Sequence, residues 1–335
     1  MSQLDNSPYQ KLIRQIGELL KERRSKAAYA VNTILVETYW NIGKYIIEFE
    51  QQGKLRAEYG SELIEKLSKD LTLAYGKGFN RNNLQYMRKL YAIFPICTTL
   101  SCKLTWSHYI EILKMDDPME ISFYTNQCEK ENWSVRELKR QRNSMLFQRL
   151  ALSRDKAGIM VLAQQGQEIQ TPEDIIKNPY VLEFLDLPQK EKYREGELEQ
   201  EIINNLQTFL LELGKGFAFI GRQYKISIGG RHFFVDLVFY HRILKCFVLI
   251  DLKKGEIEHY DIGQMNLYLN YFAEEENTEG DNPPIGIVLG AAKDEILIKY
   301  ATANITNQLF VSKYQLYLPD EKTLRQEVQR IINQG

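Results

Sequence analysis

The stretch FFVDLVFYHRILKCFVLIDLKKG, residues 233–255, contains two runs rich in Val, Phe, Leu and Ile, separated by the short connection HRIL. Runs of this length and composition are typical of neighbouring β-strands. Each run carries an aspartate, Asp236 or Asp251, and the second run adds Lys253. A charge inside an apolar strand costs several kcal/mol in rough terms unless something pairs with it, so these three side chains need a partner.

The alternation of side chains along a strand places Asp251 and Lys253 on the same face. If the two strands pair through an even-numbered loop, Asp236 lies on that face as well, nearly opposite Asp251. A change of one residue in the register would send Asp236 to the other face. The pattern therefore predicts that the three charges converge, on condition that the register is right.

The surrounding residues predict an α/β fold. An amphipathic helix over 195–214 precedes three strands, and Gly229-Gly230 is typical of the turn between the first two. Helices and strands then alternate to the end of the chain, which gives the order αβββαβ with additions around one sheet. The predicted strands are 217–228, 231–240, 245–252, 284–290 and 308–312, and the predicted helices after them are 259–275, 293–301 and 320–332.

Two carboxylates, the backbone carbonyl of Leu252 and water molecules suit a hard octahedral ion such as Mg²⁺. Beside such an ion, Lys253 is able to hold or deprotonate a water molecule and to offset the charge of a phosphate, which is the apparatus of phosphodiester hydrolysis. The alternative is structural, because a single Asp in a strand is more often a strand-end residue and Asp-x-Lys occurs by chance. The joint placement on two adjacent strands favours the catalytic interpretation.

These residues resemble the motif of the PD-(D/E)xK nuclease superfamily, and the surrounding amino-acid sequence is similar to its YhcG-type branch. The similar sequence segments include GKGFNRNNLQYMRKLYAIFP, WSHYIEILK, FFVDLVFYHRILKCFVLIDLKKG, GQMNLYLNY and PIGIVLGAAKDE. The resemblance implies a Mg²⁺-dependent nuclease domain with a mixed, restriction-endonuclease-like sheet, behind a helical domain that binds nucleic acid. It implies that Asp236 and Asp251 bind the metal and that Lys253 is the motif lysine. Asp251 stands where the branch usually has Glu, and Val235 stands in place of the proline that names the motif.

The resemblance adds further candidates around this site. Glu199, on the preceding helix, is similar to an extra acidic residue that many such enzymes direct at the metal, although it also fits a solvated helix face. Gln264 and Tyr268 are four residues apart and share a helix face, as in the Q-x-x-x-Y of the RecB-like branch, where Gln264 would orient the attacking water or contact the phosphate. Without the motif, the same two residues fit a surface glutamine and a core tyrosine.

Other candidates are predicted to contact nucleic acid. Arg222 and Gln223 lie on a strand that leads to the site, although an exposed strand face would look the same. In the helical half, GKGFNRNNLQYMRKLY resembles the turn and second helix of a helix-turn-helix, and NWSVRELKRQRN forms a basic row. The predicted nucleic-acid-binding residues are Arg81, Arg88, Lys89, Arg136, Lys139, Arg140, Arg222, Gln223 and Tyr268. Solvated helix faces are the alternative, and a long helix over 10–52 has apolar stripes sufficient for a homodimer.

The charge distribution divides the chain. Residues 1–156 hold 25 Lys and Arg against 18 Asp and Glu, whereas the remainder holds 18 against 26. A basic half beside an acidic half suits a polyanion-binding part and a part that gathers carboxylates. We predict a helical domain over 1–155, with helices near 61–74, 80–93, 106–114, 117–131 and 134–150, a connector over 156–190 and a nuclease domain over 191–335.

Several classes of function are disfavoured. The four cysteines form no C-x-x-C pair, which favours a reducing cytoplasm. No run of 18 apolar residues predicts a membrane span, and no P-loop motif predicts an ATP-driven motor. We expect a bacterial, Mg²⁺-dependent DNA endonuclease in which Mn²⁺ is able to substitute and RNA is a possible substrate. The alternatives are a non-cleaving nucleic-acid-binding adaptor and a subunit of a restriction or mobile-element complex.

Overall fold

A computed structural model describes residues 8–51, 62–96, 103–185, 195–303, 305–317 and 320–334 of the 335-residue chain. The chain forms two compact units, divided between Lys139 and Arg140. The first unit is helical and the second contains a mixed sheet, so the predicted fold class is confirmed. The predicted boundaries at 155 and 190 remain predictions.

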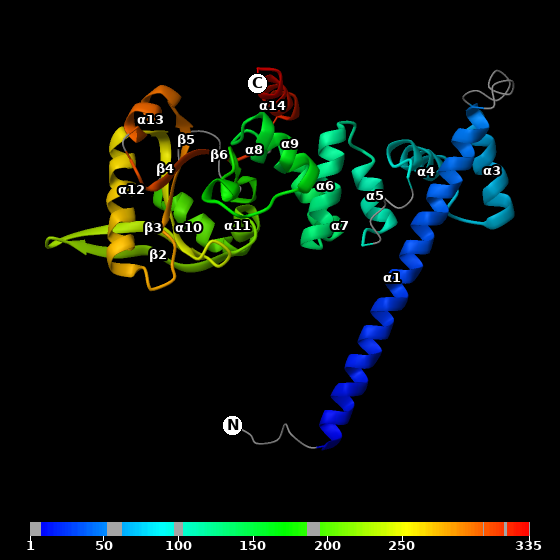
Figure 1. The fold of residues 1–335 in the computed structure, drawn as a ribbon, viewed down its shortest axis with the longest axis horizontal. Coiled ribbons are helices and arrows are strands. Elements are labelled where there is room, and N and C mark those ends of the chain that lie inside the picture. The colour runs from blue at the N-terminus through cyan, green and yellow to red at the C-terminus, as the bar shows by residue number, and fades with distance from the viewer. Residues whose placement is uncertain are drawn as a thin grey trace. The chain divides into compact units, whose positions relative to one another are not determined.

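Helices build the first unit (Figure 1). A Cβ atom at Gly43 would lie 2.0 Å from the carbonyl oxygen of Met87, so this glycine allows the first and third of these helices to approach closely. Asn80 caps the third helix by accepting from the backbone N–H of Asn83 at 2.9 Å. The helices are α1 (Pro8–Gln51), α3 (Leu63–Tyr75), α4 (Arg81–Ile93), α5 (Trp106–Ile112) and α6 (Pro118–Glu131), which confirms the predicted helices here. The predicted end of the long helix at residue 52 lies outside the described residues.

The helix predicted over 134–150 is broken in the structure. It consists of α7 (Val135–Asn143) and α8 (Leu146–Ala151), separated at Met145, which adopts a left-handed conformation with φ of 55°. A left-handed residue ends an α-helix because it redirects the backbone. Non-glycine residues rarely adopt it, so the sequence did not indicate the break.

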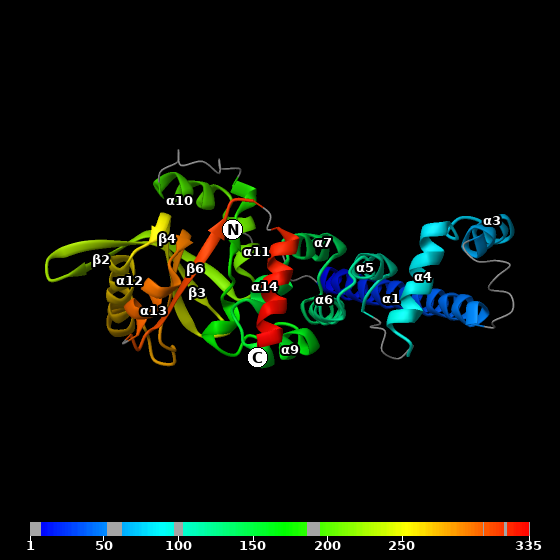
Figure 2. The ribbon, with the colours of Figure 1, turned by 90° about the horizontal axis from the view of Figure 1, so that it is seen from above.

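A six-stranded mixed sheet is the centre of the second unit (Figure 2). The strand order is β1-β6-β5-β4-β3-β2, with antiparallel pairing among β2, β3 and β4 and parallel pairing from β4 through β5 and β6 to β1. The strands are β1 (Tyr180–Val181), β2 (Phe217–Ile228), β3 (Arg231–His241), β4 (Cys246–Ile257), β5 (Ile285–Lys293) and β6 (Gln308–Gln315). The predicted strands are thereby confirmed to within a few residues.

Helices cover both faces of this sheet, as a buried sheet requires. One face packs against α10 (Glu195–Asn204) and α11 (Leu206–Leu213), which the sequence predicted as one helix and which separate at Asn205. The other face packs against α12 (His259–Tyr271), and Figure 2 shows α10 and α12 on opposite sides of the strands. The helices that follow α12 in the chain are the π-helical η5 (Phe272–Glu276), α13 (Glu295–Thr302) and α14 (Glu321–Gln334).

The segment predicted as a connector contributes to the second unit. It forms α9 (Lys156–Gln165), the short 3₁₀ turns η3 (Pro172–Ile175) and η4 (Glu183–Leu185), and strand β1, which lies parallel to β6 at the edge of the sheet. Residues 186–194 lie outside the described residues. None of the helices in the described ranges is both long and apolar enough to cross a membrane.

Candidate active site

Strands β3 and β4 pair in the register that places their aspartates together. Leu237 lies opposite Ile250, so Asp236 and Asp251 are the next residues along the pair. The backbone N–H of Leu252 donates to Oδ2 of Asp236 at 2.8 Å, and Nζ of Lys253 lies 2.9 Å from Oδ2 of Asp251. The structure thus brings together the three charges of the motif.

Asp251 lies in surroundings that oppose its negative charge. The residue is 3% exposed, and burial together with the neighbouring Asp236 carboxylate raises its pKa to about 7, although Lys253 acts in the opposite direction. Its Oδ2 atom accepts no well-aligned hydrogen bond within the described part of the chain, so the Lys253 ammonium is its charged neighbour. A buried carboxylate held in this way has a strong preference for a bound proton or a cation.

A third carboxylate lies beside the motif and was not among the predicted site residues. Asp261 of α12 is 2% exposed, and its Oδ1 atom lies 3.5 Å from Nζ of Lys253. Its Oδ2 atom accepts from the backbone N–H of Glu258 at 2.9 Å in a capping box. The spacing of Glu258 and Asp261 was a readable signal for a helix start, but only the packing of α12 on the sheet places that cap beside Lys253.

Gln223 connects the acidic residue of α10 with the strand pair. Its Nε2 atom lies 2.7 Å from Oε2 of Glu199 and 3.0 Å from Oδ1 of Asp236. Burial raises the pKa of Glu199, and the charge of Asp236 adds to this effect, whereas the Gln223 hydrogen bond and Arg222 lower it. The backbone of Gln223 has φ of 45°, a left-handed conformation that non-glycine residues seldom adopt within a strand. The fold therefore maintains an unfavourable backbone conformation at the residue whose amide bridges two carboxylates.

The pair on α12 has a different arrangement. The amide of Gln264 donates to the hydroxyl of Tyr268, which in turn donates to the backbone carbonyl of Phe234 at 3.2 Å. Tyr268 is fully buried, and burial raises the pKa of its hydroxyl. A direct contact between Tyr268 and nucleic acid would therefore need a rearrangement, whereas the half-buried Gln264 remains a candidate for contact with substrate.

Comparisons with known proteins match both parts of the chain. Residues 173–329 match the YhcG PDDEXK nuclease domain, and residues 15–149 match the DUF1016 N-terminal domain. The protein named "Putative nuclease YhcG", from Escherichia coli strain K12, is 38% identical over an alignment that covers 100% of this chain and 98% of that relative. The chain belongs to the YhcG nuclease family.

Solved structures also resemble the chain, at a greater distance. A repair endonuclease from Pyrococcus abyssi is 20% identical over 39% of this chain, with a TM-score of 0.26, and a complex of EndoMS with double-stranded DNA is 18% identical over 40%, with a TM-score of 0.27. The chain spans half the length of each of these proteins. Likenesses at this level are too distant to support an inference about function.

The residues of this YhcG-family site fit a divalent metal ion in part. Across the described ranges, no three His, Cys, Asp or Glu side chains gather into a metal-binding group. The site instead offers the adjacent Asp236 and Asp251 carboxylates, and the buried Oδ2 atom of Asp251, which the Lys253 ammonium contacts at 2.9 Å, is an acceptor that a metal ion would share. Glu199 is connected to Asp236 through Gln223, and the role of the Leu252 carbonyl remains a prediction. This donor set of oxygens suits a hard cation that retains several water molecules.

Three predicted basic residues of α4 each pair with an acidic side chain. Arg81 lies 3.5 Å from Glu65, Arg88 lies 2.9 Å from Glu50, and Lys89 lies 2.9 Å from Asp116. Exposed pairs of this kind are weak, so the side chains are free to exchange an acidic partner for a phosphate at small cost.

The row on α7 is arranged in the same way. Arg136 is exposed, Lys139 lies 3.4 Å from Glu111, and Arg140 donates to the backbone carbonyl of Leu211 at 3.0 Å. In the second unit, Arg222 donates to Gln200 at 2.8 Å. All of these residues remain candidates for phosphate contact.

Arg149 of α8, which follows the basic row of α7 in the sequence, has another role. It is fully buried, forms an ion pair with Glu212 of α11, and donates to the backbone carbonyl of Ser144 at 2.7 Å. Lys177 donates to the backbone carbonyl of Glu212. The pKa of Glu212 is lowered because these two cations outweigh the opposing effect of burial. Arg149 therefore connects α8 with α11 within the second unit.

Proposed function

We propose that this YhcG-family nuclease is a Mg²⁺-dependent DNA endonuclease. The observation that carries the proposal is the convergence of Asp236, Asp251 and Lys253 at one place on the sheet, with a buried carboxylate oxygen of Asp251 that lies 2.9 Å from the Lys253 ammonium. This arrangement is unfavourable for stability alone, so its retention supports a functional role.

The chain's own residues have distinct parts in the proposed reaction. Asp236 and Asp251 would hold Mg²⁺, with Mn²⁺ as a substitute, and the ion would polarise the scissile phosphate and lower the pKa of a bound water molecule. Lys253, 2.9 Å from Asp251, positions the attacking water and offsets charge on the phosphate. Gln223 holds Glu199 and Asp236 in fixed positions, and Gln264 contacts the water or the phosphate.

The proton on Asp251 links metal binding to pH. Burial and the neighbouring Asp236 raise the pKa of Asp251 to about 7. In the metal-free protein, the Asp251 carboxyl therefore carries a proton below about pH 7. Binding of a divalent cation requires the carboxylate form and displaces that proton. We therefore expect metal affinity, and with it cleavage, to increase with pH through about 7.

The first unit would deliver the nuclease to its substrate. Basic helices suit contacts with phosphates, which position a protein without reading sequence. Arg81, Arg88 and Lys89 of α4, together with Arg136 and Lys139 of α7, are the proposed contacts. DNA is the proposed substrate, and RNA is an outcome of the experiment below.

The experiment incubates the purified full chain with linear, supercoiled, single-stranded and branched DNA and with RNA, in Mg²⁺, in Mn²⁺ and with a chelator. We expect internal cleavage of DNA that needs the metal and is lost in Asp251→Ala and Lys253→Ala. Glu327→Ala, an exposed acidic residue of α14, is the matched control and should cleave normally.

Two results would contradict the proposal. Cleavage by Asp251→Ala at the original rate would exclude the site. Binding of nucleic acid without cleavage under every condition would favour the alternative, a non-cleaving adaptor or a subunit that needs the other components of a restriction or mobile-element complex.

We also propose a cytoplasmic location in bacteria. Cys128 and Cys246 are free thiols, each buried in a separate unit, and burial raises the pKa of both to about 12. Thiols kept protonated in this way are unreactive and suit a reducing compartment.

A further inference from the structure

Helix α1 carries an apolar stripe on its exposed side. The stripe consists of Ile13, Ile16, Leu20, Val31, Ile34 and Leu35, which are 36–65% exposed. At 3.6 residues per turn, these six side chains lie within an arc of about 100° around the helix. All side chains that the structure describes from Ile13 to Val31 are exposed. An amphipathic helix of this kind needs a partner for its apolar face.

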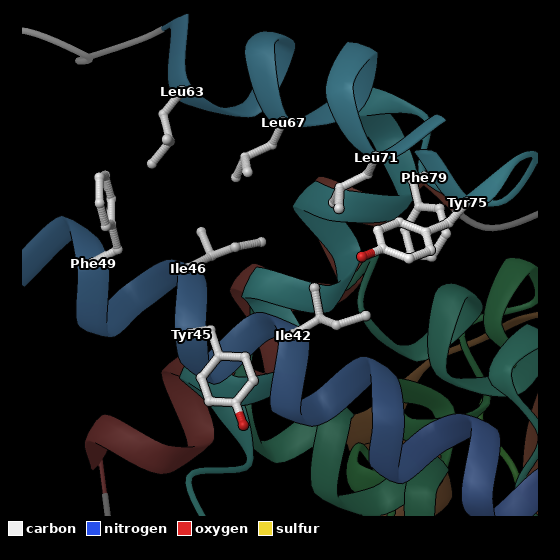
Figure 3. Close-up of a pocket in the computed structure, with 9 residues that line it drawn as sticks. All are labelled: Ile42, Tyr45, Ile46, Phe49, Leu63, Leu67, Leu71, Tyr75 and Phe79. Carbon is white, nitrogen blue, oxygen red and sulfur yellow. The ribbon is translucent and has the colours of Figure 1, made fainter. Parts of the chain in front are cut away.

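The same face of α1 continues into an apolar groove farther along the helix (Figure 3). Ile42, Tyr45 and Phe49 of α1 form one wall, and Leu63, Leu67 and Leu71 of α3 form the other, around a cavity of about 480 Å³. Tyr45 is 66% exposed. Because these α1 positions share the arc of the stripe, the stripe and the groove lie on one side of a single helix, where Arg24 and Thr38 interrupt the apolar surface.

The charges along α1 favour a particular partner. Residues 8–30 contain six Lys and Arg against two Glu, whereas residues 32–51 contain three Glu against one Lys. Two copies of such a helix attract each other when they lie antiparallel, because the basic half of each meets the acidic half of the other. A parallel pair would place like charges side by side.

The geometry of an antiparallel pair also matches the two apolar regions. With the two copies crossing at Val31, Leu20 of one copy faces Ile42 of the other, since each is eleven residues from Val31. The stripe residues Ile13 and Leu20 would then enter the groove of the partner copy. The surface from Ile13 to Phe49 is about 54 Å long at about 1.5 Å per residue. A strip of that length and about 10–12 Å wide, on the order of 600 Å² before the α3 wall is added, approaches the roughly 800 Å² per partner of a standard interface.

We propose that the protein is a homodimer in which the α1 helices of two copies pack antiparallel, the apolar stripe of each seated in the groove between α1 and α3 of the other. This pairing covers both apolar regions at once and satisfies the charge asymmetry of the helix. It places two nuclease units in one assembly, and it does not depend on the proposed substrate or metal.

Sedimentation of the full chain at micromolar concentration tests the dimer. We expect the mass of two chains, reduced to that of one chain in Val31→Asp and in Leu20→Asp. Leu19→Asp is the matched control, because Leu19 is 52% exposed on the same helix but lies outside the arc, and it should remain dimeric. Circular dichroism confirms that each variant is folded. A single-chain mass for the unchanged protein, or a dimer that survives Val31→Asp, would overturn the proposal.

Cross-linking tests the direction of the helices without disrupting the interface. Leu20→Cys and Ile42→Cys proteins are mixed, allowed to exchange subunits and oxidised, with the unchanged chain as the blank for the native cysteines. We expect a disulfide between the two variants and none within Leu20→Cys alone. A disulfide in Leu20→Cys alone shows a parallel pair, and no disulfide in the mixture shows that these residues do not meet. Either result contradicts the proposed packing.

Discussion

Two residues of the candidate site are held in unfavourable states. Asp251 is buried beside a second carboxylate, and Gln223 has a left-handed backbone conformation within a strand. Local costs of this kind, in rough terms 1–3 kcal/mol each, persist where the surrounding fold maintains them and are concentrated at functional sites. The two residues therefore allow stability and activity to be separated by substitution.

Replacement of Asp251 by Asn should increase the stability of the metal-free protein at alkaline pH. The folded-state pKa of about 7 lies above the ordinary value of 3.8, so folding favours the protonated form, and this contribution is lost as the pH rises through 7. We expect Asp251→Asn to be more stable at pH 8 by on the order of 2 kcal/mol, since loss of the Lys253 contact offsets part of the gain. Urea unfolding with chelator at pH 5 and pH 8 measures this. The same pH dependence in both proteins would contradict the prediction.

Replacement of Gln223 by Gly should reduce activity without reducing stability. Glycine adopts a φ of 45° without strain. The relief of backbone strain should therefore offset the stability lost with the two side-chain hydrogen bonds, so the free energy of unfolding should change by less than about 1 kcal/mol. Cleavage should become about 10–100-fold slower, because Glu199 and Asp236 lose their shared donor. Single-turnover cleavage and denaturant unfolding give the two values. Normal cleavage by the glycine variant would remove Gln223 from the site.

Helices α8 and α11 are joined by a buried ion pair. Arg149 of α8 and Glu212 of α11 are both at most 1% exposed, and Glu212 also accepts from the backbone N–H of Val181 at 3.0 Å. A buried pair adds little net stability relative to apolar residues, but removal of one partner leaves an uncompensated charge. The pair therefore specifies how these two helices and strand β1 meet.

Arg149→Met should destabilise the second unit by about 3–5 kcal/mol, whereas the double change Arg149→Met with Glu212→Leu should recover most of that loss. The exposed Arg330→Met is the control and should lie within about 0.5 kcal/mol of the unchanged chain. Guanidinium unfolding of the unchanged chain, of Arg149→Met, of Glu212→Leu and of the double variant forms a double-mutant cycle. A loss in the double variant equal to the sum of the two single losses would show that the two residues act independently.

The sequence predicted most elements because their signals are local. Strands β2, β3 and β4 follow from runs of apolar residues and from Gly229-Gly230, whose positive φ values suit the turn between β2 and β3. The breaks at Met145 and Asn205 had no such signal, since neither residue is a typical helix breaker. Tertiary packing decides these positions and overrides local propensity.

The contacts of the site that depend on strand register were predictable from the sequence. The contacts that depend on how helices pack on the sheet were not predictable. The convergence of Asp236 and Asp251 follows from side-chain alternation and an even loop. The approach of Asp261 to Lys253 depends on how α12 lies on the sheet, and the burial of Arg149 depends on the turn at Met145. A charge in a helix has no local feature that distinguishes a solvated position from a buried one.

The chain as a whole joins a helical unit to a nuclease unit. The first strand of the nuclease sheet, β1, precedes the αβββαβ core in the sequence. Strand β1 comes from the predicted connector, and Tyr180 pairs with Tyr314 of β6. Without β1, the β6 strand would have an open edge, which is a template for aggregation.

A fragment of residues 191–335 should therefore aggregate, whereas a fragment of residues 140–335 should be soluble and monodisperse. The shorter fragment lacks both β1 and Arg149, so it has an open edge and an unpaired Glu212. Size-exclusion chromatography and near-ultraviolet circular dichroism of the two fragments measure the difference. A well-folded, monodisperse 191–335 fragment would place the domain boundary at the end of the connector, as the sequence predicted.

The pairing of β1 with β6 also affects folding during synthesis on the ribosome. The two strands are separated by 134 residues, from Tyr180 to Tyr314, so the first edge strand emerges on the order of ten seconds before its neighbour is translated. The helical unit is complete long before that moment. A truncated message would therefore give a finished helical unit attached to an incomplete sheet, and the cutting half of the molecule would be the last part to mature.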